Sequence, residues 1–440
     1  MLIVRRHPAD SEESKELPRC LDMHLRLGGL RGVAACIWCV SVVAGTFRGG
    51  LSVSDVTDGR RTTKVKVNKR IYHVYKPPSR HVIVKDFSHK SPEPDQSIDR
   101  ASSDPNTSNL TVSTTNTFKP FNMSAIPKVD VHHHIMPPQL RGVDEGLKGM
   151  KVPDWSVSSD EAFNKSVNVH SAIFSVSTPG VTFISDPEES AKVARAMNEY
   201  SASLRDQTPS NGFFATLPSL EHTDLVLREI RYAFDTLHAD GVTLFTSYAT
   251  PGGYLGHPEY VPVWEELNRR NAVVFVHPIN HKDSVYWDER LPMPAFDWPH
   301  ETGRTAMDLI LKRRPQQFPN VKIILSHGGG TLAALVSRAC MIELPDFGGV
   351  MSAEDIVSQA KSFYFDLALS GSNEMLPLIL GFAKKSHLLF GSDFPHATAA
   401  FSQKFTKFID EFPMDDDTRK EIYHGAAEKL FPRLKGKFGA

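Results

Sequence analysis

The sequence predicts an α/β protein whose main part, residues 126–440, is a (β/α)8 TIM barrel with a C-terminal helix. From Ile126 onward, short β-branched or aromatic runs alternate with helix-length amphipathic segments, which is typical of a parallel sheet. Eight such runs occur, the number that closes this kind of barrel. Several of them end in His or Asp, and the active site of this fold forms at the C-terminal ends of the strands. A doubly wound open sheet is the alternative, but no nucleotide-binding glycine motif follows the early strands.

The predicted strands are segments of four to eight residues rich in Val, Ile and Phe. They cover residues 128–135, 171–177, 212–218, 241–248, 272–277, 322–327, 362–367 and 388–392.

The predicted helices lie between the strands and show an apolar stripe at helical spacing. One has a clear start, because Ser185-Asp186-Pro187 supplies a cap and a proline before two glutamates. They cover residues 188–205, 223–238, 258–270, 302–314, 331–343, 373–383 and 397–411, with the C-terminal helix at 415–434 outside the barrel.

Residues 1–125 form a different kind of sequence, which we predict to be a largely disordered extension. Residues 32–47 are apolar but shorter than the roughly 18 residues that a spanning helix needs, so membrane association is expected only if this run is an anchor. The basic segment 60–90 has the alternation of a short hairpin or is a solvated arm. Residues 91–124 have the composition of a polar linker.

The overall composition argues for a small-molecule partner. The chain has 440 residues, 50 Lys and Arg against 51 Asp and Glu, and a formal net charge of -1, so no global field favours nucleic acid. Four cysteines are too few for a disulfide scaffold of this size and favour a reducing compartment, the cytosol. A homodimer is a further expectation.

Three consecutive histidines end the first predicted strand, just before Met136 and Pro137. Because side chains alternate along a strand, His132 and His134 point to one side and His133 to the other. Two imidazoles on one side can bind a divalent metal, although a solvated cluster explains an isolated pair equally well.

Further ligand candidates stand at three other strand ends. Strand five ends in His277, strand six in His327 and strand eight in Asp393. Together with His132 and His134, His277 and Asp393 give three imidazoles and a carboxylate, which suit one divalent ion, Zn²⁺ first, with Mn²⁺ or Fe²⁺ tolerated. We keep His327 off the metal, as a group that bonds a substrate oxygen and moves a proton.

Three glycines follow His327 and open two further interpretations. Their backbone N–H groups are expected to approach an anion at the start of the next helix, with Thr331 as its cap. The motif His-Gly-Gly-Gly also forms the oxyanion hole of α/β-hydrolases, but that reading needs a G-x-S-x-G elbow, and the chain has none.

Taken in order, the segments 130–137 (DVHHHIMP), 276–278 (VHP), 326–330 (SHGGG) and 391–395 (GSDFP) resemble the strand motifs of the amidohydrolase superfamily. The resemblance is closest to the branch that contains aminocarboxymuconate-semialdehyde decarboxylase and the hydroxybenzoate decarboxylases, and it covers residues 126–434. Within that branch the chain looks most like the fungal 6-methylsalicylate decarboxylases of polyketide pathways.

This resemblance implies a metal held by His132, His134, His277 and Asp393, with His327 beside it. It also implies non-oxidative decarboxylation of a hydroxyaryl acid, 6-methylsalicylate to m-cresol and CO2. Strand four ends without the Lys, Glu or Cys that bridges two metals in binuclear relatives, which favours one metal. The ligands alone also permit hydrolysis of an amide or lactone, or a metal-binding barrel without activity.

The residues also suggest which groups act on the substrate. Asp393 and His327 are the candidates for protonating the ring carbon, and the family's precedent favours Asp393. A small aromatic carboxylic acid fits between rings of the segment 279–301, which holds Tyr286, Trp287, Phe296 and Trp298, although plain packing explains these rings as well. Arg304 is the candidate partner of the substrate carboxylate, or a solvated residue of a first helical turn.

Overall fold

The computed structural model divides the chain into two units, Met1–Thr114 and Thr115–Ala440, which we describe separately. In the second unit it describes residues 126–438 except 142, 144–151, 250–252, 282–283, 285–287 and 289. In the first unit it describes only the backbone of three strands.

The first unit contains a three-stranded antiparallel sheet of β1 (Thr62–Val67), β2 (Arg70–Tyr75) and β3 (Ile83–Asp86). The pairing of β1 with β2 is the hairpin that the alternation in the basic segment predicts. The apolar run 32–47 and the linker 91–124 lie outside the described residues, and the domain boundary at residue 125 stays a prediction. In the part of the chain that the structure describes, no helix is long and apolar enough to cross a bilayer.

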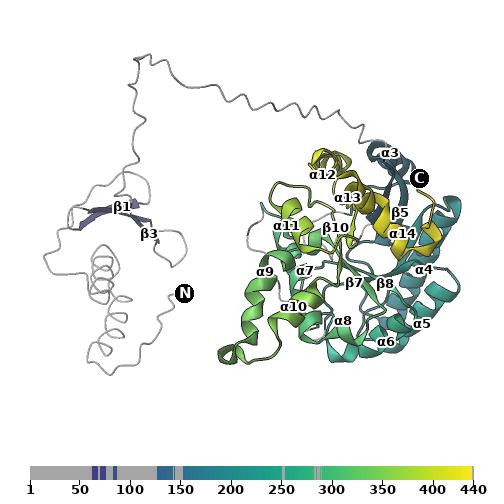
Figure 1. Ribbon diagram of the computed structural model, residues 1–440, viewed down its shortest axis with the longest axis horizontal. Helices are drawn as coiled ribbons and strands as arrows, with labels where there is room; N and C mark the ends of the chain where they lie inside the picture. Colours follow the sequence, from purple (N-terminus) through teal and green to yellow (C-terminus); the bar gives the residue numbers. More distant parts are fainter. Residues whose placement is uncertain are drawn as a thin grey trace, which may run out of the picture. The chain divides into compact units, whose positions relative to one another are not determined.

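The second unit is the predicted TIM barrel (Figure 1). Its eight strands are hydrogen-bonded in sequence order, and neighbouring strands run parallel. The ring closes where the backbone N–H groups of Val131 and His134 donate to the carbonyls of Phe390 (3.0 Å) and Phe394 (2.7 Å). The strands are β4 (Lys128–Ile135), β5 (Val169–Val176), β6 (Gly212–Ala215), β7 (Gly241–Phe245), β8 (Val273–His277), β9 (Lys322–Leu325), β10 (Tyr364–Asp366) and β11 (Leu388–Leu389).

Helices surround the strands in Figure 1, and their local sequences explain where they begin and end. The predicted start of α4 is confirmed, since Asp186 caps it and Pro187 opens it. The α-helices around the barrel are α3 (Val157–Val167), α4 (Pro187–Gln207), α5 (Thr223–Asp235), α6 (Val261–Arg269), α7 (Met293–Leu311), α8 (Arg314–Gln317), α9 (Leu332–Ala339), α10 (Ala353–Ala360), α11 (Met375–Phe382) and α12 (Ala399–Glu411). Single 3-10 turns are Pro138–Leu140, Pro258–Tyr260, His327–Gly329, Cys340–Glu343 and Pro345–Phe347.

Three of these helices differ from the sequence prediction. Helix α3 starts in a serine-rich stretch of low helix propensity, but Ser156 and Ser159 form a capping box and Asn168 ends the helix in a left-handed conformation. Helix α10 was also not predicted, and Ser352 caps it. Helix α7 begins at Met293 rather than at residue 302, because its prolines are tolerated: Pro294 lies in the first turn and Pro299 lies inside the helix.

The C-terminal segment closes one end of the barrel. It consists of α13 (Asp416–Lys420), a π-helical turn (Glu421–Gly425), α14 (Ala426–Leu430) and a 3-10 turn (Pro432–Leu434). Leu430 and Phe431 belong to the same buried cluster as Val129, Phe214 and Phe275, which fill the barrel interior. The predicted terminal helix is therefore confirmed over residues 416–430, with a π-helical turn in its middle, and its last residues pack against the interior cluster.

An irregularity in β4 decides which of its side chains face the interior. Val129 and Val131 belong to the interior cluster, and the pairing with β5 shifts register between Asp130 and His133. After the shift, the His132 ring lies 4.9 Å from the ring of Phe275, inside the barrel. The irregularity thus places His132 and His134 on the same side as the two valines, and leaves Asp130 and His133 on the opposite side.

Candidate metal centre

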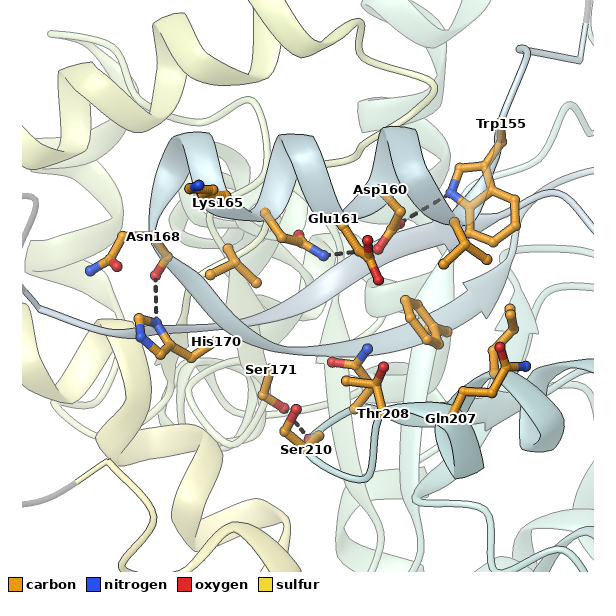
Figure 2. A pocket seen from close by; sticks show the side chains of 16 residues that line it. Trp155, Asp160, Glu161, Lys165, Asn168, His170, Ser171, Gln207, Thr208 and Ser210 are labelled. Atoms are coloured by element: carbon orange, nitrogen blue, oxygen red, sulfur yellow. Dashed lines mark hydrogen bonds between the residues drawn. The ribbon is translucent and has the colours of Figure 1, made fainter.

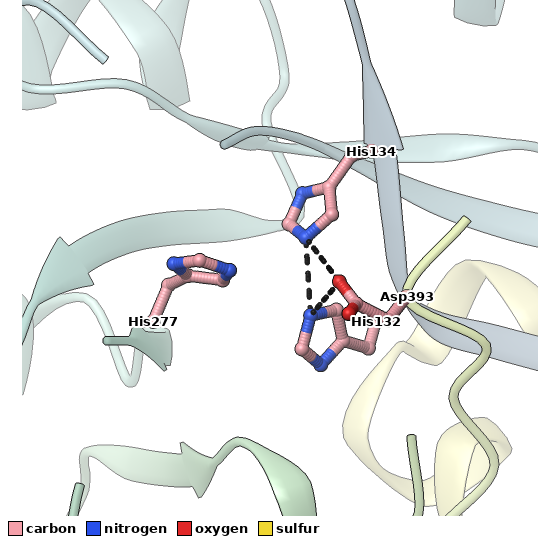
Figure 3. Close-up of side chains that lie close together, drawn as sticks. All are labelled: His132, His134, His277 and Asp393. Atoms are coloured by element: carbon pink, nitrogen blue, oxygen red, sulfur yellow. Dashed lines mark hydrogen bonds and ion pairs between the residues drawn. The ribbon is translucent and has the colours of Figure 1, made fainter. Parts of the chain in front are cut away.

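Four predicted ligands meet at the C-terminal ends of the barrel strands (Figure 3). His132, His134, His277 and Asp393 each offer one ligand atom, and these atoms all lie within 4.8 Å of one another. The Nε2 atoms of His132 and His134 are 3.0 Å apart, and each is 3.2 Å from Oδ1 of Asp393. All four residues are buried. The structure therefore brings together residues from β4, from β8 and from the segment after β11.

Each imidazole is oriented by a bond at its other nitrogen. His132 Nδ1 bonds Oδ2 of Asp366 (3.1 Å) and His277 Nδ1 bonds the carbonyl of Pro278 (2.8 Å). A carbonyl and a carboxylate accept hydrogen bonds, so these Nδ1 atoms carry protons, and Nε2 is the atom that each imidazole would offer to a metal in its neutral form. His134 Nδ1 lies 2.9 Å from the Ser175 hydroxyl, which serves the same purpose.

The ionisation of the cluster reflects burial and charge together. Burial opposes a charge on His132, but the carboxylates of Asp366 and Asp393 outweigh it and raise the pKa of His132 to about 10. Burial lowers the pKa of His134 to about 3 and holds the pKa of His277 well below its ordinary value. Burial opposes ionisation of Asp393, yet its contacts with the His132 and His134 imidazoles keep its pKa well below the usual range. The carboxylate therefore stays charged among imidazoles.

The donor set fits a single divalent metal. Two buried Nε2 atoms at 3.0 Å, facing each other and a carboxylate, form an arrangement that a cation between them stabilises. Three nitrogen donors and one oxygen donor match the ligand types of zinc sites that leave room for substrate, and manganese and iron accept the same set. The residues present therefore suit one divalent ion.

His327 lies beside the cluster but outside the group of ligand atoms. Its ring is 4.7 Å from that of His132, and its Nδ1 donates to the carbonyl of Ala368 (3.1 Å). Burial lowers the pKa of His327, so the ring is neutral near pH 7. His327 (φ 55°) and Asp393 (φ 62°) both take the left-handed conformation, which residues other than glycine adopt rarely.

The predicted anion cradle at Gly328–Gly330 is wrong. The N–H groups of Gly329, Gly330 and Thr331 donate to the carbonyls of Ser326, His327 and Pro299, and Thr331 makes no side-chain cap. Glycine is needed there for space: a Cβ on Gly330 would lie 2.0 Å from the Pro299 carbonyl oxygen. These residues therefore pack the loop against α7.

The predicted substrate residues lie in different places. Phe296 is 53 % exposed on α7, with its ring 5.1 Å from that of His300. The Arg304 side chain is 66 % exposed and lies 3.5 Å from the Tyr254 hydroxyl. Trp287 and Tyr286 lie outside the described residues. Whether Trp287, Phe296 and Arg304 contact substrate stays a prediction.

Trp298 is the aromatic residue of this segment that lies close to the ligands. It is buried, its ring is 5.9 Å from that of His277, and its Nε1 donates to Oδ1 of Asn280 (2.6 Å). Asn280 lines a cavity of about 740 Å³ at the C-terminal rim of the barrel. That volume is in the range of small-molecule sites. The cavity is lined by residues that follow β4 to β8: Val143, Val181, Thr182, Phe183, Ile184, Ser185, Pro187, Ser190, Ser219, Glu221, His222, Ser247, Tyr248, Ala249, Ile279, Asn280 and His281.

Several supporting residues were not predicted from sequence. Asp366 holds His132 with one oxygen, and its other oxygen accepts from the backbone N–H groups of His327 (3.2 Å) and Ala368 (3.0 Å). An Asp at the end of an apolar strand was a usable signal, since the same signal identified Asp393. Ser175 gave no such signal, because a serine within a strand is common in any sheet.

Comparisons with known proteins show relatives that match the barrel unit. The amidohydrolase family profile matches residues 129–433. A 6-methylsalicylic acid decarboxylase of Penicillium expansum is 44 % identical over 315 residues, which cover 70 % of this chain and 97 % of that protein. A 2-amino-3-carboxymuconate-6-semialdehyde decarboxylase of Dictyostelium discoideum is 24 % identical over 48 % of this chain and 58 % of its own length. A dihydroxybenzoic acid decarboxylase of a Polaromonas species, solved with bound manganese and 2-nitroresorcinol, superimposes with a TM-score of 0.60 at 20 % identity, over 71 % and 98 % of the two chains.

Proposed function

The chain belongs to the amidohydrolase family, and from this premise we propose that it is a metal-dependent, non-oxidative decarboxylase of a hydroxyaryl carboxylic acid. The substrate we propose is 6-methylsalicylate, converted to m-cresol and CO2 within a fungal polyketide pathway. The observation that carries the proposal is the buried group of His132, His134, His277 and Asp393 at the catalytic end of a barrel that aligns with nearly the whole length of a 6-methylsalicylic acid decarboxylase.

Zinc is the metal we propose, with manganese as the alternative. Three imidazoles and one carboxylate are typical of zinc, while the same donors also bind manganese. The manganese in the Polaromonas enzyme supports the alternative. Metal analysis of the purified protein decides between them.

The chemical difficulty of the reaction is that direct loss of CO2 would leave an unstable aryl anion. Protonating the ring carbon that bears the carboxylate avoids this, because a hydroxyl in the ortho position supplies electrons to the ring. When bound, the divalent ion would draw electron density from the substrate's phenol and carboxylate oxygens and fix both in place.

Asp393 is the group to which we assign the proton. Its Oδ1 faces His132 and His134 at 3.2 Å, which leaves Oδ2 to accept the proton that the phenol loses and return it to the ring carbon. A carboxyl group whose pKa is low is a strong donor once protonated. The C–C bond then breaks, its electron pair restores the aromatic ring, CO2 leaves, and the resulting cresolate takes a proton from solvent to give m-cresol. His327, with Nδ1 fixed on the Ala368 carbonyl, presents Nε2 to a substrate oxygen.

The cavity at the rim is the place we propose for the aromatic ring. One of its lining residues, Ile279, is two positions after His277 in the sequence. The wall combines apolar side chains (Val181, Phe183 and Ile279) with polar groups (Ser247 and Asn280). A flat ring with a methyl group and two oxygen substituents needs this combination.

The proposed function is tested by incubating the purified, metal-loaded protein with 6-methylsalicylate and following m-cresol and CO2. We expect stoichiometric amounts of both products without an added redox cofactor. Turnover of a lactone or amide without CO2 release would identify a hydrolase, and metal binding without any turnover would identify an inactive barrel. We also propose that the catalytic unit, starting near residue 126, works in the cytosol.

We further propose that the enzyme is a homodimer that uses an apolar segment between α9 and α10. Five large apolar side chains in or beside it are exposed: Leu335, Met341, Leu344, Phe347 and Val350, at 39 to 59 %. Backbone bonds such as Val350 N to Ile342 O and Gly349 N to Leu344 O hold the segment in shape. An ordered apolar surface of this kind marks a protein contact.

Light scattering after size-exclusion chromatography checks the dimer. The wild-type chain is expected to elute with twice the mass of one chain, and the triple variant Leu344→Ser, Phe347→Ser, Val350→Ser as a monomer. Phe401→Ser is the matched control, because Phe401 is 46 % exposed on α12, outside this segment. A triple variant that keeps the wild-type mass would exclude this surface.

A further inference from the structure

A hydrogen-bonded triad of Asp160, His133 and Asp130 lies buried behind β4, and the proposed reaction does not use it. We propose that this triad is a positioning device: it fixes the backbone at His132 and Asp393 and thereby increases the affinity of the site for its metal. The inference rests on the proposed metal site, and it concerns residues that do not themselves reach the metal.

His133 connects two carboxylates. Its Nδ1 lies 2.9 Å from Oδ2 of Asp130, and its Nε2 lies 2.6 Å from Oδ1 of Asp160. The His133 and Asp130 side chains are fully buried, and that of Asp160 is 6 % exposed. Since ionised carboxylates only accept hydrogen bonds, both ring nitrogens donate, and both bonds are charge-assisted.

Asp130, at the inner end of the triad, holds together two segments that carry metal ligands, β4 and the segment after β11. Oδ1 of Asp130 accepts from the backbone N–H of His132 and from that of Ser392, both at 3.1 Å. Ser392 precedes Asp393, whose own N–H donates to the His132 carbonyl (2.8 Å). One carboxylate thus fixes the first strand against the segment after the last strand, at the point where the barrel closes.

Asp160, at the outer end of the triad, belongs to α3. Besides His133, Asp160 accepts from Trp155 Nε1 (3.1 Å) and from Asn164 Nδ2 (2.8 Å). Figure 2 shows the bond between Trp155 and Asp160 at the wall of a separate cavity of about 580 Å³, which residues of α3 and of the end of α4 line. Helix α3 therefore determines where Asp160 lies, and Asp160 determines where His133 lies.

The surroundings of His133 restrict the movement of this triad. Its ring lies between those of Phe163, Phe174 and Phe394, with centroids 6.1, 5.8 and 5.6 Å away. In such an apolar environment hydrogen bonds are stronger than in water, and no solvent competes for the donors. A displacement of His133 therefore moves Asp130, and Asp130 cannot move without releasing His132 and Ser392.

The test is the variant Asp160→Asn, which keeps the size of the side chain and removes the charge from the outer end. The dissociation constant for Zn²⁺, measured against a chromogenic chelator, is expected to rise about 10-fold or more, as is common for groups that orient metal ligands. The visible spectrum of the Co²⁺-loaded variant is expected to shift, because the ligand geometry changes. Both readouts are independent of enzyme activity.

Glu229→Gln is the matched control. Glu229 is a buried carboxylate on α5 that accepts from Arg195 (2.9 Å) and Asn198 (2.7 Å), and Asn198 connects it to Thr216 rather than to β4 or β11. The Glu229→Gln variant also removes a buried charge. We expect it to lower the melting temperature, while the Zn²⁺ dissociation constant stays within about twofold of wild type.

If Asp160→Asn does not fold, Trp155→Phe removes only one donor from Asp160, and a smaller rise of the dissociation constant, about 3-fold, is expected. A folded variant at either position with unchanged Zn²⁺ affinity and an unchanged Co²⁺ spectrum would overturn the inference. Failure of the wild-type chain itself to bind Zn²⁺ or Co²⁺ would instead overturn the metal centre on which the inference rests.

Discussion

Replacing His132 with alanine is expected to abolish metal binding and to lower kcat/KM for 6-methylsalicylate by on the order of 10⁴-fold. His132 supplies one of four ligand atoms, and its ring contacts both the neighbouring ligand His134 and Asp393. Its loss leaves three ligand atoms and removes one of the two imidazoles that contact the Asp393 carboxylate, so the remaining ligands are held less firmly in place. Metal content by mass spectrometry and the rate of m-cresol formation measure the two effects.

His170→Ala is the control for this variant. His170 is exposed at the start of β5, and in the described structure its ring bonds only the Asn168 carbonyl, at 3.3 Å. Its replacement is expected to leave metal content and activity at wild-type levels. A His132→Ala protein that retains one metal per chain would show that the ion binds elsewhere.

The second large effect is expected for Asp393→Asn when the metal is supplied in excess. The amide oxygen can still coordinate, but the side chain no longer accepts and returns a proton, so kcat is expected to fall by about 10³-fold, within the range of general acid catalysis. Substrate binding is expected to change less, because the phenol and carboxylate oxygens of the substrate are still fixed. Single-turnover kinetics with quantified metal occupancy separates the two effects.

His327→Gln distinguishes the two candidate donors. In our account His327 hydrogen-bonds a substrate oxygen, so its loss is expected to lower kcat by about 10- to 100-fold, less than the loss of Asp393. A larger decrease for His327→Gln than for Asp393→Asn, at equal metal occupancy, would assign the proton to His327 instead.

The parts of the site that the sequence predicts are those in which position along a strand decides position in space. His277 ends β8, Asp393 lies in the short segment that follows β11, and a barrel brings such ends to one rim. The eight strands were found for the same reason, since each is a buried β-branched or aromatic run between helices. Their ends were predicted too long in most cases, because a barrel strand stops pairing before its extended backbone stops.

The remaining parts depend on contacts between residues distant in sequence. Asp366 meets His132 across 234 positions, and Asp160 on α3 meets His133 across 27. The irregularity in β4 is set by its pairing with β5 and leaves no mark in the local sequence. Helix α7 begins early because the packing of Met293 and Trp298 outweighs the two prolines. The end of the barrel is closed by Phe431 and its neighbours, whose amphipathic pattern also fits a surface helix.

Anomalous diffraction at the metal absorption edge, from crystals of the purified enzyme, locates the metal without reference to activity. We expect one peak per chain, bounded by the Nε2 atoms of His132, His134 and His277 and by a carboxylate oxygen of Asp393. Two peaks at this end of the barrel, or one peak away from these four side chains, would exclude the proposed single-metal centre.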